Sequence, residues 1–340
     1  MIETIIKCLT RLHLKKQKNP VGRVLIIASY YVYKKLRDIL AKRDNKIASK
    51  LYLRARNLER NIKGIKWSFA TIDELLRWST EWIKTFPTSY DVIVGIPRSG
   101  LLVANIIASK LGKPLTTPEL FSRGQYWVSK LIDKKREYKN ILLVDDSIDS
   151  GKTMEKSFQF LRSYSENLNI TKAGLIVKEN SKKLVDLYYK VIPQPRVFEW
   201  NLLHQAKIGK LATDLDGVIC ENCPPGVDLD EELYTKWIKN AKPYLIPAFE
   251  INVIVSNRLE KYRSDTKKWL ANYGVHYKKL ILWDIQSKQE RGGKYAQRKI
   301  EVLLKIKPDI FWESSFTQAK QIWKITKIPT LCIEEMTLFT

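Results

Sequence analysis

The chain has 340 residues, and its 60 Lys and Arg against 36 Asp and Glu give a formal net charge of +24. This length, with 44% hydrophobic residues, is typical of two globular domains and excludes a disordered chain. Four cysteines are too few for a disulfide framework, and the longest apolar run near the N-terminus, residues 24–33, is half of a bilayer span. We therefore expect a cytoplasmic protein with reduced thiols.

The first 66 residues form a basic segment, with eighteen Lys or Arg and four Asp or Glu. Basic residues alternate with apolar stretches, so the pattern predicts a helical arm, with a break between two helices at Pro20 and Gly22. A basic amphipathic arm suits an anionic membrane surface, an anionic lipid-linked substrate or, less well, a nucleic acid. Alternatively, its polar face is simply solvated while the other packs on the next domain. Binding at the inner face of the cytoplasmic membrane is one expectation.

The next element is an apolar strand over 91–96, followed by a glycine-containing loop and a helix over 101–110. The glycines allow backbone amides to approach an anion, and Arg98 adds a charge-assisted donor. The loop is therefore a candidate anion-binding site, made of Gly95, Ile96, Pro97, Arg98, Ser99 and Gly100.

Residues 141–153 carry the clearest pattern of the chain. Four apolar residues predict a buried parallel strand, and Asp145 and Asp146 follow at its carboxyl end. A tight loop from Ser150 to Thr153 then opens a helix. Carboxylates at a strand end can hold ribose hydroxyls or Mg²⁺, and helix N–H groups can hold a phosphate. The alternative is an ordinary strand–turn–helix with surface acids.

This stretch resembles the PRPP-binding signature of type I phosphoribosyltransferases, with Ser150 where Thr is usual, and the upstream loop resembles their pyrophosphate loop. The resemblance implies that Asp145 and Asp146 hold ribose and Mg²⁺. Asp149 is the candidate base. A mobile lid is expected between 116 and 139, with 121–127 at its centre. The 5-phosphate would be held by Ser150, Gly151, Lys152 and Thr153.

A second motif, Asp214-Leu-Asp216-Gly-Val, follows a short apolar strand at 211–213. Residues two apart on a strand point the same way, so both carboxylates face one pocket. The motif alone also suits a calcium loop or a turn. It resembles motif I of HAD-superfamily phosphatases, which implies that Asp214 is the nucleophile and Asp216 the general acid and base.

The downstream sequence resembles the other HAD motifs. Ser256, near the end of a buried strand, would hydrogen-bond the phosphoryl group. Lys299 would neutralise the phosphate, with Lys294 as the alternative. Glu313 would complete a Mg²⁺ site with Asp214 and the carbonyl of Asp216, although Ser314 stands where a second acid is common. A non-catalytic α/β domain with this pattern is the alternative.

About forty residues separate the first two motifs, which leaves no room for a large cap. An open site suits a large or tethered substrate. Cys220 and Cys223 form a C-x-x-C, but a zinc site would need a second pair. We therefore expect no structural metal there.

These elements predict a basic helical arm over 1–66, a type I phosphoribosyltransferase-like parallel sheet domain over 67–205, and a HAD-like Rossmannoid domain with minimal cap over 206–340. Both domains belong to the α/β class, with helices on both faces of the sheet.

From 91 to 335 the chain is also similar to fused phosphoribosyltransferase–HAD proteins of bacterial surface-polysaccharide loci, most distinctively over 258–270. This resemblance implies a bifunctional enzyme that transfers 5-phosphoribose from PRPP to a lipid-linked glycan and then removes the 5-phosphate, leaving ribofuranose. Mg²⁺ would serve both sites. One alternative is a nucleobase or nucleotide phosphoribosyltransferase fused to a nucleotide or nucleic-acid-end phosphatase. The other is a PRPP-sensing regulator without turnover, which the intact pair Asp214 and Asp216 disfavours.

Overall fold

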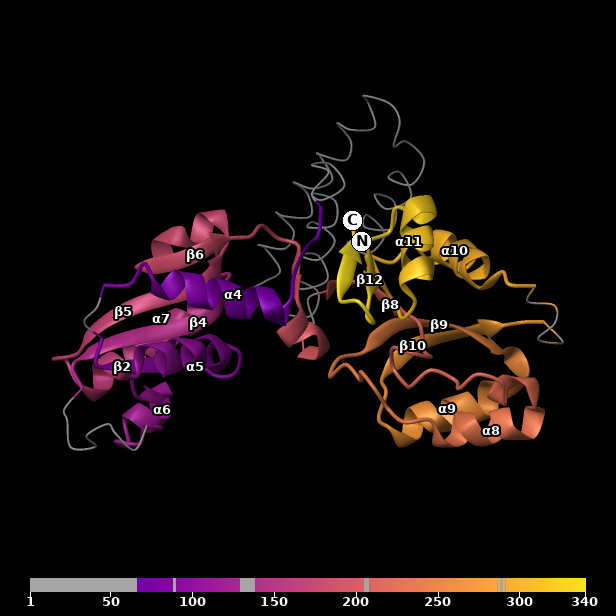
Figure 1. Cartoon of the computed structure of the whole chain (residues 1–340), viewed down its shortest axis with the longest axis horizontal. Helices are drawn as coiled ribbons and strands as arrows, with labels where there is room; N and C mark the ends of the chain where they lie inside the picture. The colour runs from indigo at the N-terminus through magenta and orange to yellow at the C-terminus, as the bar shows by residue number, and fades with distance from the viewer. Residues whose placement is uncertain are drawn as a thin grey trace, which may run out of the picture. The chain divides into compact units, whose positions relative to one another are not determined.

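The computed structural model describes residues 66–87, 90–128, 138–204, 208–285, 287, 290 and 292–340. The predicted arm over 1–66 lies outside the described residues, apart from Lys66. The described chain divides into two compact units, with the break between Leu202 and Leu203 (Figure 1). No helix in these ranges is both long and apolar enough to cross a bilayer.

The first unit is built on a five-stranded sheet in the order β3-β2-β4-β5-β6, in which all neighbours are parallel. Its strands are β2 (Val92–Gly95), β3 (Leu115–Thr116), β4 (Asn140–Ile148), β5 (Asn169–Val177) and β6 (Leu187–Val191). Its helices are α4 (Ile72–Ile83), α5 (Gly100–Leu111), α6 (Pro118–Phe121) and α7 (Lys152–Tyr164). Two short parallel strands, β1 (Ser68–Ala70) and β7 (Arg196–Phe198), pair separately and are followed by a 3₁₀ segment, η2 (Glu199–His204).

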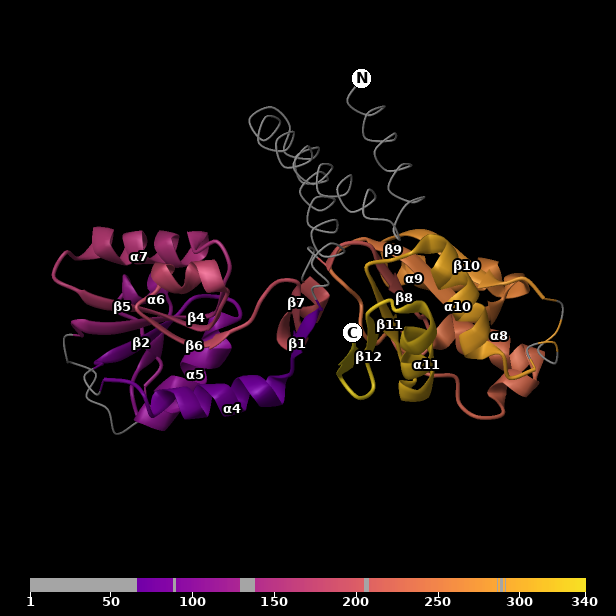
Figure 2. The same cartoon turned by 90° about the horizontal axis from the view of Figure 1, so that it is seen from above.

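Helices cover both faces of this sheet, because successive side chains on a strand point to opposite faces (Figure 2). Ile93, Leu142 and Val144 pack with buried residues of α4 and α5. Val92 and Leu143 pack on the other side, with Phe121 of α6 and with Met154 and Leu161 of α7. The near-continuous apolar runs of β2 and β4 are therefore those of a doubly covered parallel sheet.

Two glycines set how the helices meet the strands. A Cβ at Gly100 would lie 2.8 Å from the carbonyl oxygen of Val144 and 3.0 Å from the Cα of Asp145, so only glycine lets the start of α5 approach β4 this closely. Gly151 has a φ of 72° directly before α7, a conformation that favours glycine. Gly100 therefore places the N-terminus of α5 beside the acids of β4, and Gly151 allows α7 to begin directly after the turn that follows β4.

The second unit has a six-stranded sheet in the order β10-β9-β8-β11-β12-β13, parallel except for the last pair. Its strands are β8 (Leu211–Thr213), β9 (Ile251–Leu259), β10 (Tyr277–Trp283), β11 (Ile310–Glu313), β12 (Thr330–Cys332) and β13 (Thr337–Phe339). Its helices are α8 (Glu231–Asn240), α9 (Arg263–Asn272), α10 (Tyr295–Ile306) and α11 (Phe316–Thr326), with α10 and α11 on one face and α8 and α9 on the other (Figure 1).

One expectation about the first unit needs correction. The predicted strand over 141–144 extends to Ile148, because β5 pairs with it as far as the Ile148–Val177 register, so Asp145 and Asp146 lie within the strand and not after it. At the centre of the expected lid Phe121 is buried in the core, whereas 123–125 and Trp127 are exposed. Trp127 pairs with Leu115 along the edge of β3. The remainder of the expected lid, 129–137, lies outside the described residues.

Candidate active sites

The adjacent carboxylates of β4 form the centre of the first candidate site. Asp146 is 5% exposed, and its backbone N–H donates to Oδ1 of Asp145 at 2.9 Å. Burial and the neighbouring charge of Asp146 hold the pKa of Asp145 well above its usual value. Burial also raises the pKa of Asp146, although a hydrogen bond from Trp200 opposes the rise. A buried and a half-buried carboxylate that repel each other fit a divalent cation that prefers oxygen ligands, such as Mg²⁺, or the hydroxyl groups of a sugar.

The predicted anion loop lies between β2 and α5, next to these acids. Gly95, Ile96 and Gly100 are buried, whereas Pro97 and Arg98 are exposed and Ser99 is half-buried. The guanidinium of Arg98 is therefore accessible from solvent, while Gly100 holds the loop against Asp145.

Trp200 and Asn201, which lie in η2, were not predicted as site residues. The indole Nε1 of Trp200 donates to Oδ2 of Asp146 at 2.8 Å, and Asn201 Nδ2 donates to the same oxygen at 3.3 Å. Asn201 Oδ1 accepts hydrogen bonds from Arg98 Nη2 at 3.0 Å and from Ser99 Oγ at 2.7 Å. One amide thus connects the anion loop to the carboxylate of β4.

We expect Asn201→Ala to weaken the binding of a pyrophosphate-bearing ligand about tenfold, because it releases Arg98, Ser99 and Asp146 together. Loss of hydrogen bonds to charged groups, each contributing about 1.5–3 kcal/mol, supports a change of that order. Calorimetric titration with PRPP and Mg²⁺ would measure it, with Asn105→Ala on α5 as control, since Asn105 bonds only Ser109 among the contacts described. Equal dissociation constants for wild type and Asn201→Ala would contradict this role.

The rest of the first site lies where β4 leads into α7. The carboxylate of Asp149 pairs with Lys178 at 2.9 Å, so the candidate base is held beside an ammonium group. Ser150, Lys152 and Thr153 are exposed, and the first N–H groups of a helix have no partner within the helix. With Gly151 they present backbone donors and a lysine to an anion.

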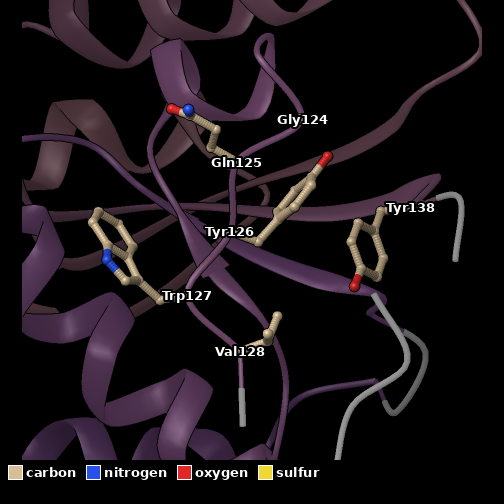
Figure 3. A pocket seen from close by; sticks show the side chains of 6 residues that line it. All are labelled: Gly124, Gln125, Tyr126, Trp127, Val128 and Tyr138. Atoms are coloured by element: carbon tan, nitrogen blue, oxygen red, sulfur yellow. The ribbon is translucent and has the colours of Figure 1, made fainter. Parts of the chain in front are cut away.

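A cavity of about 500 Å³ lies elsewhere in the first unit, lined by 124–128 and Tyr138. The rings of Tyr126 and Tyr138 lie side by side, 4.8 Å apart between centroids (Figure 3). Tyr138 precedes β4, seven residues before Asp145 on an extended strand, so it lies about 23 Å from the acids at 3.3 Å per residue. This cavity is not part of the acidic site.

The second candidate site is centred on Asp214, which directly follows β8. Its backbone pairs with β11 through the carbonyl of Trp312, which places Asp214 beside Glu313. Lys299 of α10 reaches both acids, with Nζ 2.6 Å from Asp214 Oδ2 and 2.8 Å from Glu313 Oε2. Lys299 is 1% exposed, whereas Lys294 is exposed at the start of α10. The structure therefore brings Lys299, and not Lys294, to the acids.

Charge in this triad is unbalanced, since two carboxylates share one ammonium group. Burial and the charge of Glu313 raise the pKa of Asp214 to about 8, against the opposing effect of Lys299. The charges of Asp214 and Glu313 raise the pKa of Lys299 against its burial, so the ammonium form persists. Among the described residues no group of three or more His, Cys, Asp and Glu side chains is placed to hold a metal. The carboxylates of Asp214 and Glu313 nevertheless offer oxygen ligands of the kind that Mg²⁺ prefers.

Glu313 is also fixed by the residues that replace the expected second acid. Its Oε1 accepts from the backbone N–H and hydroxyl of Ser314, at 3.0 and 3.3 Å, and from Ser315 N at 3.4 Å. A Cβ at Gly217, whose φ is 77°, would lie 2.6 Å from the Ser314 Cβ. Gly217 and Ser314 therefore close the turn after Asp216 against the end of β11.

Asp216 and Ser256 complete this site. Ser256 is fully buried within β9 and not at its end, and its Oγ accepts from the backbone N–H of Arg258 at 3.1 Å. The carboxylate of Asp216 pairs with the guanidinium of Arg258, with Nη2 2.6 Å from Oδ1. Arg258 was not predicted as a site residue, although an arginine two residues after a serine on an apolar strand is visible in the sequence.

Comparison with known proteins identifies the first unit. Residues 61–206 match the family described as the phosphoribosyl transferase domain. Orotate phosphoribosyltransferase of Sulfurisphaera tokodaii is 31% identical over 74 residues, which is 22% of this chain and 37% of that protein. This chain thus aligns with little more than a third of that relative.

Two solved structures are similar to the same part of the chain. Xanthine-guanine-hypoxanthine phosphoribosyltransferase of Helicobacter pylori is 19% identical with a TM-score of 0.32, covering 40% of this chain and 93% of that one. Purine phosphoribosyltransferase of Pyrococcus horikoshii is 22% identical with a TM-score of 0.32, covering 40% and 95%.

Proposed function

We propose that this chain, whose residues 61–206 form a type I phosphoribosyltransferase domain, transfers 5-phosphoribose from PRPP at Asp145 and Asp146 and hydrolyses a phosphomonoester at Asp214. One observation carries the first half. Asp145 lies against Gly100 at the end of the candidate anion loop, and α7, whose start is the second candidate anion-binding element, begins six residues after Asp146. A sugar with a phosphate at each end matches that order.

At the transferase site the residues act by charge and position. Arg98, Ser99 and the loop amides would hold the pyrophosphate, and the start of α7 the 5-phosphate. Asp145 and Asp146 would hold the ribose hydroxyls and stabilise the positive charge that develops at C1 as pyrophosphate leaves. Asp149 is 2.9 Å from Lys178 and would need to leave that ion pair to accept the acceptor's proton. Bound Mg²⁺ would neutralise charge on the pyrophosphate.

At the second site the geometry supports a HAD-type phosphatase. Asp214 would attack phosphorus, Lys299 would offset the charge of Asp214 and phosphate, and Ser256 would hydrogen-bond a phosphoryl oxygen. Asp216 would exchange protons with the leaving oxygen and then with water. Bound Mg²⁺ would neutralise charge between Asp214, Glu313 and the phosphate.

The proposal has two forms, which differ in the acceptor of the phosphoribosyl group: a nucleobase or a lipid-linked glycan. The relatives are named for orotate and purines, which favours a nucleobase acceptor and a phosphatase that acts on nucleotides or nucleic-acid ends. A lipid-linked glycan acceptor stays a prediction from the sequence. Its motive is the second site: a phosphatase would remove the 5-phosphate, which a nucleotide needs and a ribosylated glycan does not. No comparison supports the glycan.

Release of pyrophosphate tests these acceptors directly. The chain is incubated with PRPP and Mg²⁺, and with orotate, purine bases or a lipid-linked glycan in turn. Release with a base supports the nucleobase form, and release only with the lipid-linked glycan supports the other. Failure to bind PRPP in calorimetry would overturn the transferase proposal as a whole.

The basic arm supports a further expectation about membrane binding. Near an anionic membrane each basic residue contributes about 1 kcal/mol, so the +14 charge of residues 1–66 predicts strong, salt-sensitive adsorption. We expect the full chain to sediment with phosphatidylserine liposomes at low salt, and a chain without the arm to stay in solution. Equal sedimentation of both would reject the membrane as partner, and tight binding of RNA instead would favour the nucleic-acid alternative.

A further inference from the structure

We propose that Arg258 is a positioning residue for the phosphatase reaction, which holds the carboxylate of Asp216 by Oδ1 and leaves Oδ2 available to the leaving group. The proposal rests on the phosphatase function proposed above. Arg258 Nη2 donates to Oδ1 of Asp216 at 2.6 Å. Arg258 Nε lies 3.0 Å from Oδ1 and 3.3 Å from Oδ2.

The two carboxylate oxygens of Asp216 are unequal. Oδ1 accepts both guanidinium contacts and also faces the thiol of Cys220 at 3.3 Å. Oδ2 has one longer contact, and the Asp216 side chain is 24% exposed while that of Arg258 is fully buried. The oxygen with fewer donors is the one left to exchange a proton at the open side of the site.

Arg258 is itself fixed by neighbours from several elements. Nη1 donates to Thr266 Oγ1 of α9 at 3.3 Å, and Nη2 contacts the Sγ of Cys220 at 3.4 Å. The guanidinium lies over the ring of Trp237 of α8, 4.9 Å from its centroid. A buried ion pair adds little to stability over apolar residues of similar size, so a guanidinium held at this depth points to a role in orientation.

The reaction shows why orientation matters. Asp214 forms a bond to phosphorus as the bond to the leaving oxygen breaks, and that oxygen takes a proton from Asp216. Water then attacks the aspartyl-phosphate, its proton passes to Asp216, and inorganic phosphate leaves as Asp214 is restored. Proton transfer by a well-placed group contributes about 10²- to 10⁴-fold, and only when the leaving oxygen needs a proton.

The dependence on leaving group therefore separates positioning from a merely structural role. Arg258→Lys and Thr266→Val would be assayed with ribose 5-phosphate, whose alkoxide leaves poorly, and with p-nitrophenyl phosphate, whose phenolate leaves without a proton. We expect kcat/KM for ribose 5-phosphate, which reports the steps up to expulsion of the leaving group, to fall about 10²-fold in Arg258→Lys, with little change for p-nitrophenyl phosphate. Thr266→Val removes only the hydrogen bond to Arg258 Nη1. It should therefore lower the ratio of the ribose 5-phosphate rate to the p-nitrophenyl phosphate rate by a smaller factor. Arg263→Lys is the control, because Arg263 pairs with Glu260 and does not contact Asp216 among the bonds described.

Three outcomes decide the proposal. Equal losses on both substrates in Arg258→Lys, with the Thr266→Val ratio unchanged, would overturn it. In the Asp216→Asn background Arg258→Lys should have no further effect on the ratio, and an additive effect would also overturn it. A wild-type chain that hydrolyses neither substrate would instead reject the phosphatase function, and the inference with it.

Discussion

Replacing Asp214 with asparagine is expected to lower phosphatase activity by about 10³-fold or more, because the amide is a poor nucleophile toward phosphorus. The fold should survive, since Asn still accepts the backbone N–H of Leu215 that Asp214 Oδ1 accepts at 2.8 Å. Phosphate release from p-nitrophenyl phosphate measures the loss. Activity within tenfold of wild type would show that Asp214 is not the nucleophile.

The two candidate lysines provide a matched pair for the same assay. Lys299→Ala leaves two buried carboxylates without their ammonium partner and should lose activity as Asp214→Asn does. Lys294→Ala changes an exposed side chain and should retain activity. The reverse result would move the phosphate-binding role to Lys294.

Replacing Asp146 with asparagine is expected to reduce phosphoribosyl transfer by about 10²- to 10³-fold, the range for removing one group that stabilises charge in a transition state. The variant keeps an oxygen for the hydrogen bonds from Trp200 and Asn201 but removes the charge. Asp145→Asn should act in the same direction. Pyrophosphate release with a working acceptor measures the effect.

Phosphatase activity is the internal control for these variants, since the two sites lie in different units. Asp146→Asn should hydrolyse p-nitrophenyl phosphate at the wild-type rate. If it also transfers phosphoribose normally, the pair Asp145 and Asp146 is not the transferase site.

The features that could be predicted from the sequence are those set by residues close together in the chain. The strand, acids and glycine of 141–153 form one continuous unit, so the start of α7 at Lys152 follows from the residues themselves. Helix α9 likewise ends before Gly274, whose φ is 64°. Short-range turn and capping preferences need no knowledge of distant contacts. The expected parallel α/β sheets depend on the same alternation of strands and helices.

What could not be predicted depends on contacts between distant residues. Trp200 and Asn201 reach Asp146 across 54 and 55 positions of the chain, and Arg258 reaches Asp216 across 42. No periodicity links such pairs, so their partners become visible only when the strands are aligned. The length of β4 could not be predicted for the same reason, because pairing with the distant β5 continues the strand beyond Asp145 and Asp146 to Ile148.

The mass of the transferase product is the most direct test of two sites acting in sequence on one sugar. The acceptor identified by pyrophosphate release is incubated with PRPP and Mg²⁺, and with either wild-type chain or Asp214→Asn. The account predicts an acceptor that gains ribose alone with the wild-type chain, and ribose with one phosphate with the variant. An acceptor of the same mass from both proteins would contradict it.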